Sequence, residues 1–301
     1  MKHFLLLTLL LLTACWKTPQ NSEFPSYTNN LYQEFLPKSS WADLRLHGKV
    51  KKLTEYSYYL EYADNGQIQQ GALSTTVPAK VETFFTSQGR ISTQLFYSAD
   101  NIAYPEATSY YHYFNGKIDS IFTINMGEVP NTSAQAFKYD LQGNLIQHRN
   151  YVNGRKILTT YYQAELTPQG TLLTERESEG EELSTSKTLH YYDARGLKYR
   201  EALYEGNKLL SQLTFESDLQ GRRVKCRFEG MVGDRLKSTT TFTYDLQGNL
   251  TSTIDERKHT NEQMLLPTKN SYQYDPHGNI LRAYHISDAY SEIRTYEIGY
   301  F

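Results

Sequence analysis

Hydrophobic and polar positions alternate along the chain from residue 49 to its end. The alternation is clearest at 239–245 (TTTFTYD) and at 271–275 (SYQYD). A period of two is typical of strands with one buried face, and helical spacing is not sustained anywhere in this region. The pattern therefore predicts an all-β domain over residues 48–301.

The segment before this domain has a different pattern. Residues 30–47 predict a short helical lead-in of two helices, the first capped by Asn30 and the second by Ser39 or Ser40, ending at Gly48. Residues 15–29 contain Pro and Ser without periodicity, so we expect a tether there.

The heptapeptide YDLQGNL occurs twice, at 139–145 and at 244–250. Alignment of the chain on its glycine gives eight turns that follow one another at intervals of 25 to 30 residues. Their glycines are Gly89, Gly116, Gly143, Gly170, Gly196, Gly221, Gly248 and Gly278. A second set of turn residues lies midway between them, so each repeat of ~27 residues predicts two strands joined by hairpin turns.

The residues of these turns have separate expected roles. An Asp three positions before the Gly can accept hydrogen bonds from N–H groups inside the turn, and the Gly takes the left-handed conformation that closes it. The aromatic residue before the Asp can pack against the aliphatic residue that starts the next strand. The pattern assigns structural turn roles to Tyr139, Asp140, Gly143, Asn144, Tyr192, Asp193, Gly196, Asp218, Gly221, Tyr244, Asp245, Gly248, Asn249, Tyr274, Asp275, Gly278 and Asn279. Calcium loops are not expected, because each turn supplies one Asp rather than alternating oxygen ligands.

Eight such repeats and their flanking strands predict an antiparallel meander of about eighteen strands. Open sheets of this width curl, split or close. We therefore expect a strongly coiled sheet, either an open superhelical scroll or a flattened, barrel-like layer. The loop 64–77 or the lead-in 30–47 could plug one end.

The motif Tyr-Asp-x-x-Gly-Asn followed by an aliphatic residue resembles the YD repeat of Rhs-type proteins, over roughly residues 80–300. The entry GKVKKLTE at 48–55 is similar to the opening of small bacterial YD-repeat lipoproteins. In large relatives such repeats form hollow β-shells that enclose a toxin. Eight repeats are too few for such a shell and no toxin domain follows, so this part of the family's function is not expected.

The N-terminus carries a processing signal rather than part of the fold. Lys2 precedes an apolar stretch, 4–12, that is too short to span a bilayer. The sequence LTAC at 12–15 resembles a bacterial lipobox, which implies cleavage after residue 14 and lipid on Cys15. An ordinary secretory signal that ends near a Cys is the alternative.

Lipidation would fix the location of the mature protein. Two or three acyl chains hold a protein on a membrane almost permanently. In lipoproteins of bacteria with two membranes, the residues after the lipidated Cys help to sort them. Trp16 and Lys17 favour the outer membrane, whereas an Asp after the Cys would favour retention in the inner one. The sequence does not indicate which leaflet the protein faces.

The amino-acid composition indicates which classes of binding partner are expected. The chain contains 26 Tyr but 2 Trp and 2 Cys, and its formal net charge is −2, so no nucleic-acid surface is expected. Rows of Tyr on strand faces suit sugar rings or a partner protein, and equally suit cross-strand ladders that hold a thin sheet together. The Tyr in question are Tyr56, Tyr58, Tyr110, Tyr161, Tyr191 and Tyr296.

Catalytic signatures are weak. Ser184 and Lys187 match Ser-x-x-Lys, but on a strand this spacing puts the two side chains on opposite faces. Cys226 lies between cations and is expected as a buried strand residue. The eight His show no zinc-binding spacing, so no metal, no cofactor and no enzyme are expected.

These observations favour an envelope-anchored lipoprotein that acts as a non-catalytic binding or scaffold module for carbohydrate or for an envelope protein. The alternatives are a hydrolase-like enzyme with a non-local site on the sheet and a purely structural envelope protein. A transmembrane barrel is disfavoured, because Thr295, Glu297 and Gly299 share the face where lipid would need apolar groups.

Overall fold

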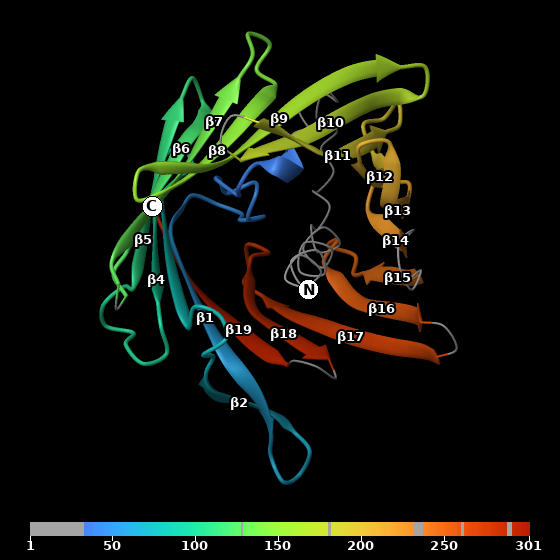
Figure 1. The fold of residues 1–301 in the computed structure, drawn as a ribbon. Helices are drawn as coiled ribbons and strands as arrows, with labels where there is room; N and C mark the ends of the chain where they lie inside the picture. The colour runs from blue at the N-terminus through green and yellow to red at the C-terminus, as the bar shows by residue number, and fades with distance from the viewer. Residues whose placement is uncertain (1–32, 128, 180–181, 231–236, 260–261, 288–290) are drawn as a thin grey trace. The chain divides into compact units, whose positions relative to one another are not determined.

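The computed structural model describes residues 33–301, except 128, 180–181, 231–236, 260–261 and 288–290 (Figure 1). Nineteen β-strands of these residues belong to one sheet. The strands are β1 (Val50–Tyr62), β2 (Ile68–Leu73), β3 (Lys80–Phe85), β4 (Ile91–Tyr97), β5 (Ala107–Phe114), β6 (Lys117–Asn125), β7 (Asn131–Tyr139), β8 (Leu145–Val152), β9 (Arg155–Thr167), β10 (Gly170–Glu179), β11 (Glu182–Tyr192), β12 (Lys198–Glu205), β13 (Lys208–Ser217), β14 (Arg223–Gly230), β15 (Lys237–Tyr244), β16 (Leu250–His259), β17 (Glu262–Tyr274), β18 (Ile280–Ser287) and β19 (Glu292–Tyr300).

Consecutive strands pair antiparallel along most of the chain. This confirms the all-β antiparallel meander that the alternating pattern predicts. The number of strands is one above the expected eighteen because 64–77, predicted as a loop, contains β2. Its residue Ile68 lies opposite Tyr62 of β1, so the chain makes a long hairpin there.

β1 departs from the simple strand order. In its first half, Leu53 lies opposite Thr83 of β3 on one side and opposite Ile298 of β19 on the other. The first long strand and the last strand are therefore hydrogen-bonded neighbours, and they lie side by side in Figure 1.

The chain divides into two compact units, each with its own core. The first contains Ala164–Thr174 and Thr185–Pro267 with the described residues up to Pro37. The second contains Lys38–Gln163, Glu175–Ser184 and Thr268–Phe301.

The core of the second unit forms around the start of β1. Val50, Leu53, Phe85 and Ile91 are buried there and pack against Trp41 from the lead-in. The Trp41 indole Nε1 also donates to the backbone oxygen of Val50 at 2.8 Å. The lead-in thus covers the apolar end of this face of the sheet.

The lead-in itself differs from the expected pair of helices. Among its described residues it has one 3₁₀ helix, Gln33–Phe35, and a turn at 41–45. The Asp43 carboxylate accepts hydrogen bonds from the Ser39 N–H and the Ser40 hydroxyl, both at 2.9 Å. These local bonds stabilise a turn. A segment this short gains too few helical hydrogen bonds to offset the free-energy cost of helix nucleation.

The 3₁₀ helix is held in the first unit by a buried charge cluster. Lys198 Nζ lies 2.7 Å from Glu34 Oε2 and 2.8 Å from Glu201 Oε2. Phe35 packs edge-on against His190, with ring centroids 5.0 Å apart. Burial raises the pKa of Glu34, but Lys198, His190 and the Tyr192 hydroxyl together outweigh it, and the net shift is downward. These contacts therefore hold the first described residues against β11 and β12 of the first unit.

The first unit has a core on β13–β15. Leu213, Phe215, Cys226 and Phe242 form it, and Cys226 is 2% exposed. Its thiol is thus a packing group of the core, as expected for a buried strand residue.

The predicted signal peptide at 1–14, the tether at 15–29, the lipidation site Cys15 and the helix cap Asn30 lie outside the described residues. No helix of the described part of the chain is long and apolar enough to cross a membrane.

Candidate functional site

The glycines of the repeat turns have positive φ angles, the left-handed conformation that favours glycine. The φ angles of the eight repeat glycines are +80°, +83°, +85°, +139°, +76°, +79°, +82° and +86°, in chain order. In the Gly143 turn, the N–H of Gly143 donates to Asp140 O at 3.0 Å, and the N–H of Asp140 donates to Asn144 O at 2.9 Å. The same two backbone hydrogen bonds close the turns of Gly89, Gly196, Gly221, Gly248 and Gly278.

The Asp side chain completes the turn from inside. Asp140 Oδ1 accepts from the Asn144 N–H at 2.8 Å, and Oδ2 accepts from the Asn144 amide at 2.9 Å. Burial opposes ionisation of Asp140, but the hydrogen bonds from Asn144 and from the Gln142 and Gly143 N–H groups together lower its pKa. The same Asp–Asn bonds occur at 245/249 and 275/279, and Asp193 and Asp218 pair instead with Arg195 and Arg222. These carboxylates are occupied within the turns, which gives them a structural role.

The aromatic residue of the motif joins one repeat to the preceding one. Tyr139 Oη donates to Ile118 O at 2.8 Å, and Tyr244 Oη donates to Arg223 O at 2.6 Å. Each acceptor lies two residues after the glycine of the preceding turn. A cation at the adjoining position covers each ring, with Lys117 Nζ 5.1 Å from the Tyr139 centroid. The constant spacing of 21 residues between donor and acceptor is the sequence signal for this contact.

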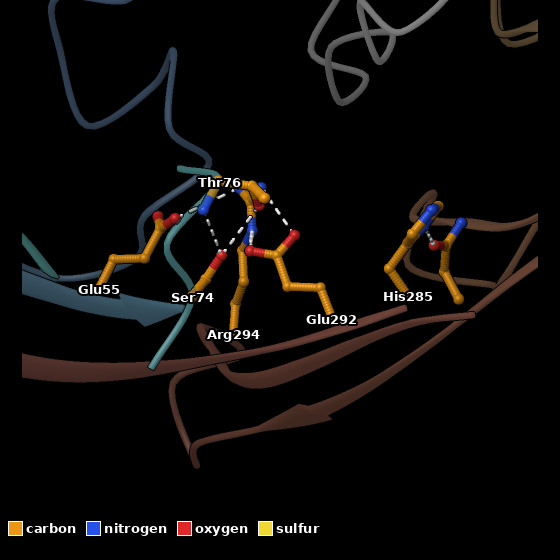
Figure 2. A network of polar contacts seen from close by, with 7 residues as sticks. Glu55, Ser74, Thr76, His285, Glu292 and Arg294 are labelled. Atoms are coloured by element: carbon orange, nitrogen blue, oxygen red, sulfur yellow. Dashed lines mark hydrogen bonds and ion pairs between the residues drawn. The ribbon is translucent and has the colours of Figure 1, made fainter. Parts of the chain in front are cut away.

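Charged and polar side chains that take no part in the turns lie on the strand faces of the second unit. Register places Glu55 opposite Tyr296, and Ser57 opposite Arg294. Directly opposed residues share a face, so these side chains lie on the face that Leu53 begins. Arg294 bridges two carboxylates, with Nε 2.9 Å from Glu292 Oε1 and Nη1 3.2 Å from Glu55 Oε1 (Figure 2).

The ionisation of this network follows from burial and pairing. Burial raises the pKa of Glu55, and Arg294 opposes that shift only in part. Burial lowers the pKa of Arg294, but the carboxylates of Glu55 and Glu292 outweigh it, so the net shift is upward. His285, further along in Figure 2, has its pKa lowered by burial, and its Nδ1 lies 2.7 Å from Asn270 Oδ1. The network thus holds one cation between two acids, and an imidazole with a lowered pKa lies further along the sheet.

Ser74 lies next to the strand that faces this network, because its N–H donates to Ser57 O at 2.8 Å and Ser57 lies opposite Arg294. The Ser74 hydroxyl oxygen lies 3.1 Å from that of Thr76, which lines a pocket (Figure 2). Residues 75–78 line one part of a pocket of about 630 Å³, whose floor comes from β4, β5 and β6 and from the loop between β4 and β5. Register places Phe96 opposite Val81, which itself lies opposite Glu55, so the pocket and the charged network share one face.

The lining of the pocket is rich in hydroxyl groups. They belong to Thr75, Thr76, Ser98, Ser109 and Thr123. Ser109 and Thr123 lie opposite each other on β5 and β6, with hydroxyl oxygens 2.8 Å apart. The Ser98 hydroxyl is buried and makes no hydrogen bond within the described part of the chain. A buried hydroxyl without a partner is costly, so this one is a group that a ligand can satisfy.

Other groups complete the chemistry of the pocket. Asn125 adds an amide, Asp100 and Glu106 add exposed carboxylates, and Phe96 adds an aromatic ring. This combination of hydroxyl, amide and carboxylate groups around one ring suits a neutral, polyhydroxylated ligand. The sequence did not indicate this site because its residues come from separate loops and three strands, and each Ser or Thr alone resembles an ordinary strand or loop residue.

The Tyr singled out in the sequence do not form one site. Tyr110 and Tyr161 are each 41% exposed, whereas Tyr56 and Tyr58 stack with centroids 6.3 Å apart. Tyr191 packs against Tyr199 at 6.1 Å, and burial raises the pKa of Tyr296. The cross-strand contact of Tyr191 agrees with the structural alternative for that residue, whereas Tyr56 and Tyr58 contact each other along one strand, β1.

The sequence candidates for catalysis are not brought together. Ser184 and Lys187 both lie on β11, where an odd spacing puts their side chains on opposite faces. Cys226 lies in the core of the first unit. Among the residues that the structure describes, no three His, Cys, Asp or Glu side chains form a group that could hold a metal ion.

Comparisons with known proteins give a likeness to solved structures alone. No protein-family model matches the chain, and no curated protein matches it. A porin-like protein from Bacteroides uniformis is similar at 11% identity over 83% of this chain and 96% of that chain, with a TM-score of 0.39. A porin-like protein from Bacteroides vulgatus is similar at 10% identity over 84% and 98%, with a TM-score of 0.29. The Tc holotoxin pore of Photorhabdus luminescens is similar at 11% identity over 78% of this chain and 17% of that chain, with a TM-score of 0.29. These scores are below 0.5, so no conclusion about function is drawn from them.

Proposed function

We propose that this chain is an outer-membrane lipoprotein, anchored through Cys15, that binds carbohydrate without catalysis in the pocket on β4, β5 and β6. The observation that carries the binding role is the buried Ser98 hydroxyl, which has no partner in the described structure and lines a pocket rich in other hydroxyls. A sugar hydroxyl can both donate to and accept from such a group.

The size and chemistry of the pocket support this ligand class. A volume of about 630 Å³ lies within the range of small-molecule sites and accommodates one or two sugar rings. The Phe96 side chain offers an apolar surface for a sugar face, while the Ser109–Thr123 pair and Asn125 offer hydrogen bonds around it. Binding without catalysis requires neither a general acid nor a nucleophile beside the ligand.

The location rests on the sequence. The lipobox at 12–15 supports lipidation of Cys15, and Trp16 favours the outer membrane. Fractionation of cells that express the full chain or its Cys15→Ala variant tests the anchor. We expect the wild-type chain in the outer-membrane fraction, and the Cys15→Ala chain to lose that attachment; equal membrane attachment of both contradicts the anchor.

The binding role is tested with the full chain on an array of bacterial envelope saccharides, namely peptidoglycan fragments and lipopolysaccharide core oligosaccharides. We expect at least one saccharide class to bind, and Ser98→Ala to weaken that binding while the fold is retained. A chain that binds no saccharide on the array and none from cell-wall digests contradicts the carbohydrate role.

A further inference from the structure

We propose that, in each of the two units, the edge formed by the Asp-x-x-Gly turns contacts a lipid bilayer through leucines at the turn tips. The inference rests on the lipid anchor of the proposed function and adds a second contact with the same membrane. Its basis is the one apolar position between the Asp and the Gly of the repeated heptapeptide, which turn chemistry does not use.

That position is the residue directly after the Asp. Leu141, Leu219 and Leu246 occupy it and are 102%, 94% and 102% exposed. The Asp and Gly of each turn make its hydrogen bonds, so nothing in the turn itself requires an apolar side chain between them. Two other turns at this edge also present large apolar groups, Phe114 at 71% and Leu166 at 91% exposure.

The meander topology gathers these tips on one edge in each unit. Hairpin turns alternate between the two ends of the strands, so every Asp-x-x-Gly turn of a unit lies at the same end. Leu166, Leu219 and Leu246 belong to the first unit, and Phe114 and Leu141 to the second. Successive turns at one edge are two strands apart, or about 10 Å. The tips therefore form a spaced row that suits a soft, extended apolar phase better than a compact protein pocket.

The chain reaches the domain at this same edge. Glu34 pairs with Lys198 and accepts a hydrogen bond from Tyr192, and these two residues flank the Asp193–Gly196 turn. In the second unit, the N–H of Trp41 donates to the oxygen of the turn residue Gly89 at 2.9 Å. Residue 33 lies 18 positions after Cys15, a stretch that spans at most about 65 Å. The described structure thus begins beside a turn at the edge of the first unit that carries Leu166, Leu219 and Leu246.

The groups beside the leucines permit approach to lipid. Each of the three is followed by a neutral amide, Gln142, Gln220 or Gln247. The adjoining Asp140 and Asp218 carboxylates bond to Asn144 and Arg222 inside their turns. Insertion of the tips into the headgroup region therefore removes no unpaired carboxylate from water.

Fluorescence of probes at the tips tests the inference. The lipidated full chain carries single changes Leu141→Cys, Leu219→Cys or Leu246→Cys, labelled with an environment-sensitive dye; Cys226 is buried and the unchanged chain measures its background. Asn207→Cys is the matched control, because Asn207 is exposed at the tip of a turn at the opposite edge of the first unit. The proteins are reconstituted into vesicles of phosphatidylethanolamine and phosphatidylglycerol, with and without spin-labelled lipid.

We expect blue-shifted emission at the three tip positions and at least twofold stronger quenching by spin-labelled lipid than at residue 207. A chain that floats with the vesicles while its tip probes behave like the one at residue 207 overturns this inference and leaves the anchor intact. A chain that does not float with vesicles contradicts the anchor and overturns both. A blue shift that appears without vesicles and grows with protein concentration shows contact with a second copy, which also overturns the lipid assignment.

Discussion

The Tyr139 hydroxyl donates a hydrogen bond to the backbone oxygen of Ile118 at 2.8 Å, and so joins two successive repeats near their turns. The sheet has modest apolar cores, and bonds of this kind link each hairpin to the one before it. The Tyr of the Tyr-Asp motif therefore acts between repeats, while the Asp acts within one turn.

Removal of this hydroxyl should destabilise the second unit. Tyr139→Phe leaves the Ile118 oxygen without its donor, and we expect a loss of about 1–2 kcal/mol in the free energy of unfolding. Denaturant unfolding measures it. Tyr110→Phe, which changes a side chain that is 41% exposed, should cost far less, and equal losses for the two variants would contradict the role of Tyr139.

Gly143→Ala should be costly because the φ of Gly143, +85°, lies in the left-handed region. The Lys117 ammonium, which donates to Gly143 O, lies where the new Cβ would be, but it ends a flexible side chain and can move aside. We expect a loss of about 1–2 kcal/mol in the free energy of unfolding from the backbone strain. Gly127→Ala is the control, since nothing lies within 4 Å of a Cβ built there. A Gly143→Ala chain as stable as the Gly127→Ala chain would refute the account of the turn.

Glu82 should make the stability depend on acid pH. It lies 2.6 Å from Lys52 Nζ and accepts from Tyr97 Oη at 2.7 Å. Burial opposes its ionisation, but the hydrogen bonds from Lys52, Tyr97 and Lys80 lower its pKa from 4.5 to about 2. A lowered pKa in the folded state stabilises fully above the ordinary value, and the contribution is lost as the pH falls from 4.5 towards 2.

The measurement for this prediction is unfolding of Glu82→Gln between pH 7 and pH 2. We expect a loss of about 1–3 kcal/mol at pH 7 that shrinks as the pH falls below the ordinary pKa. Glu61→Gln, at an exposed position, should keep the pH dependence of the parent chain. A Glu82→Gln chain whose deficit is constant over this range would show that the ion pair is not the cause.

Much of the fold follows from local sequence rules. The repeat glycines predict left-handed turns, and the alternation between them predicts the strands that join them. β2 was not predicted, because Gln69, Gln70 and Gly71 lack alternation and Gly is a poor strand residue, while pairing with β1 decides its conformation. The lead-in was predicted as helical because Ser39 resembles an N-cap, whereas Asp43 uses the Ser39 N–H to build a turn.

The candidate site could not be predicted from such local rules. Ser98, Ser109 and Thr123 meet only because β4, β5 and β6 pair in a register set by turns elsewhere in the chain. Arg294 meets Glu55 across 239 positions of sequence. Contacts of this separation leave no local spacing to detect in one sequence.

The most direct test of the central claim is a calorimetric titration of the full chain with the envelope saccharide that binds best on the array. The same titration is carried out with the double variant Ser109→Ala/Thr123→Val, which removes the paired hydroxyls from the pocket floor. Thr108→Val is the control, since the alternation of side chains along β5 places residue 108 on the opposite face. We predict wild-type affinity for Thr108→Val and at least a tenfold weaker affinity for the double variant, with both folded by circular dichroism. Equal affinity of all three proteins would contradict carbohydrate binding in this pocket.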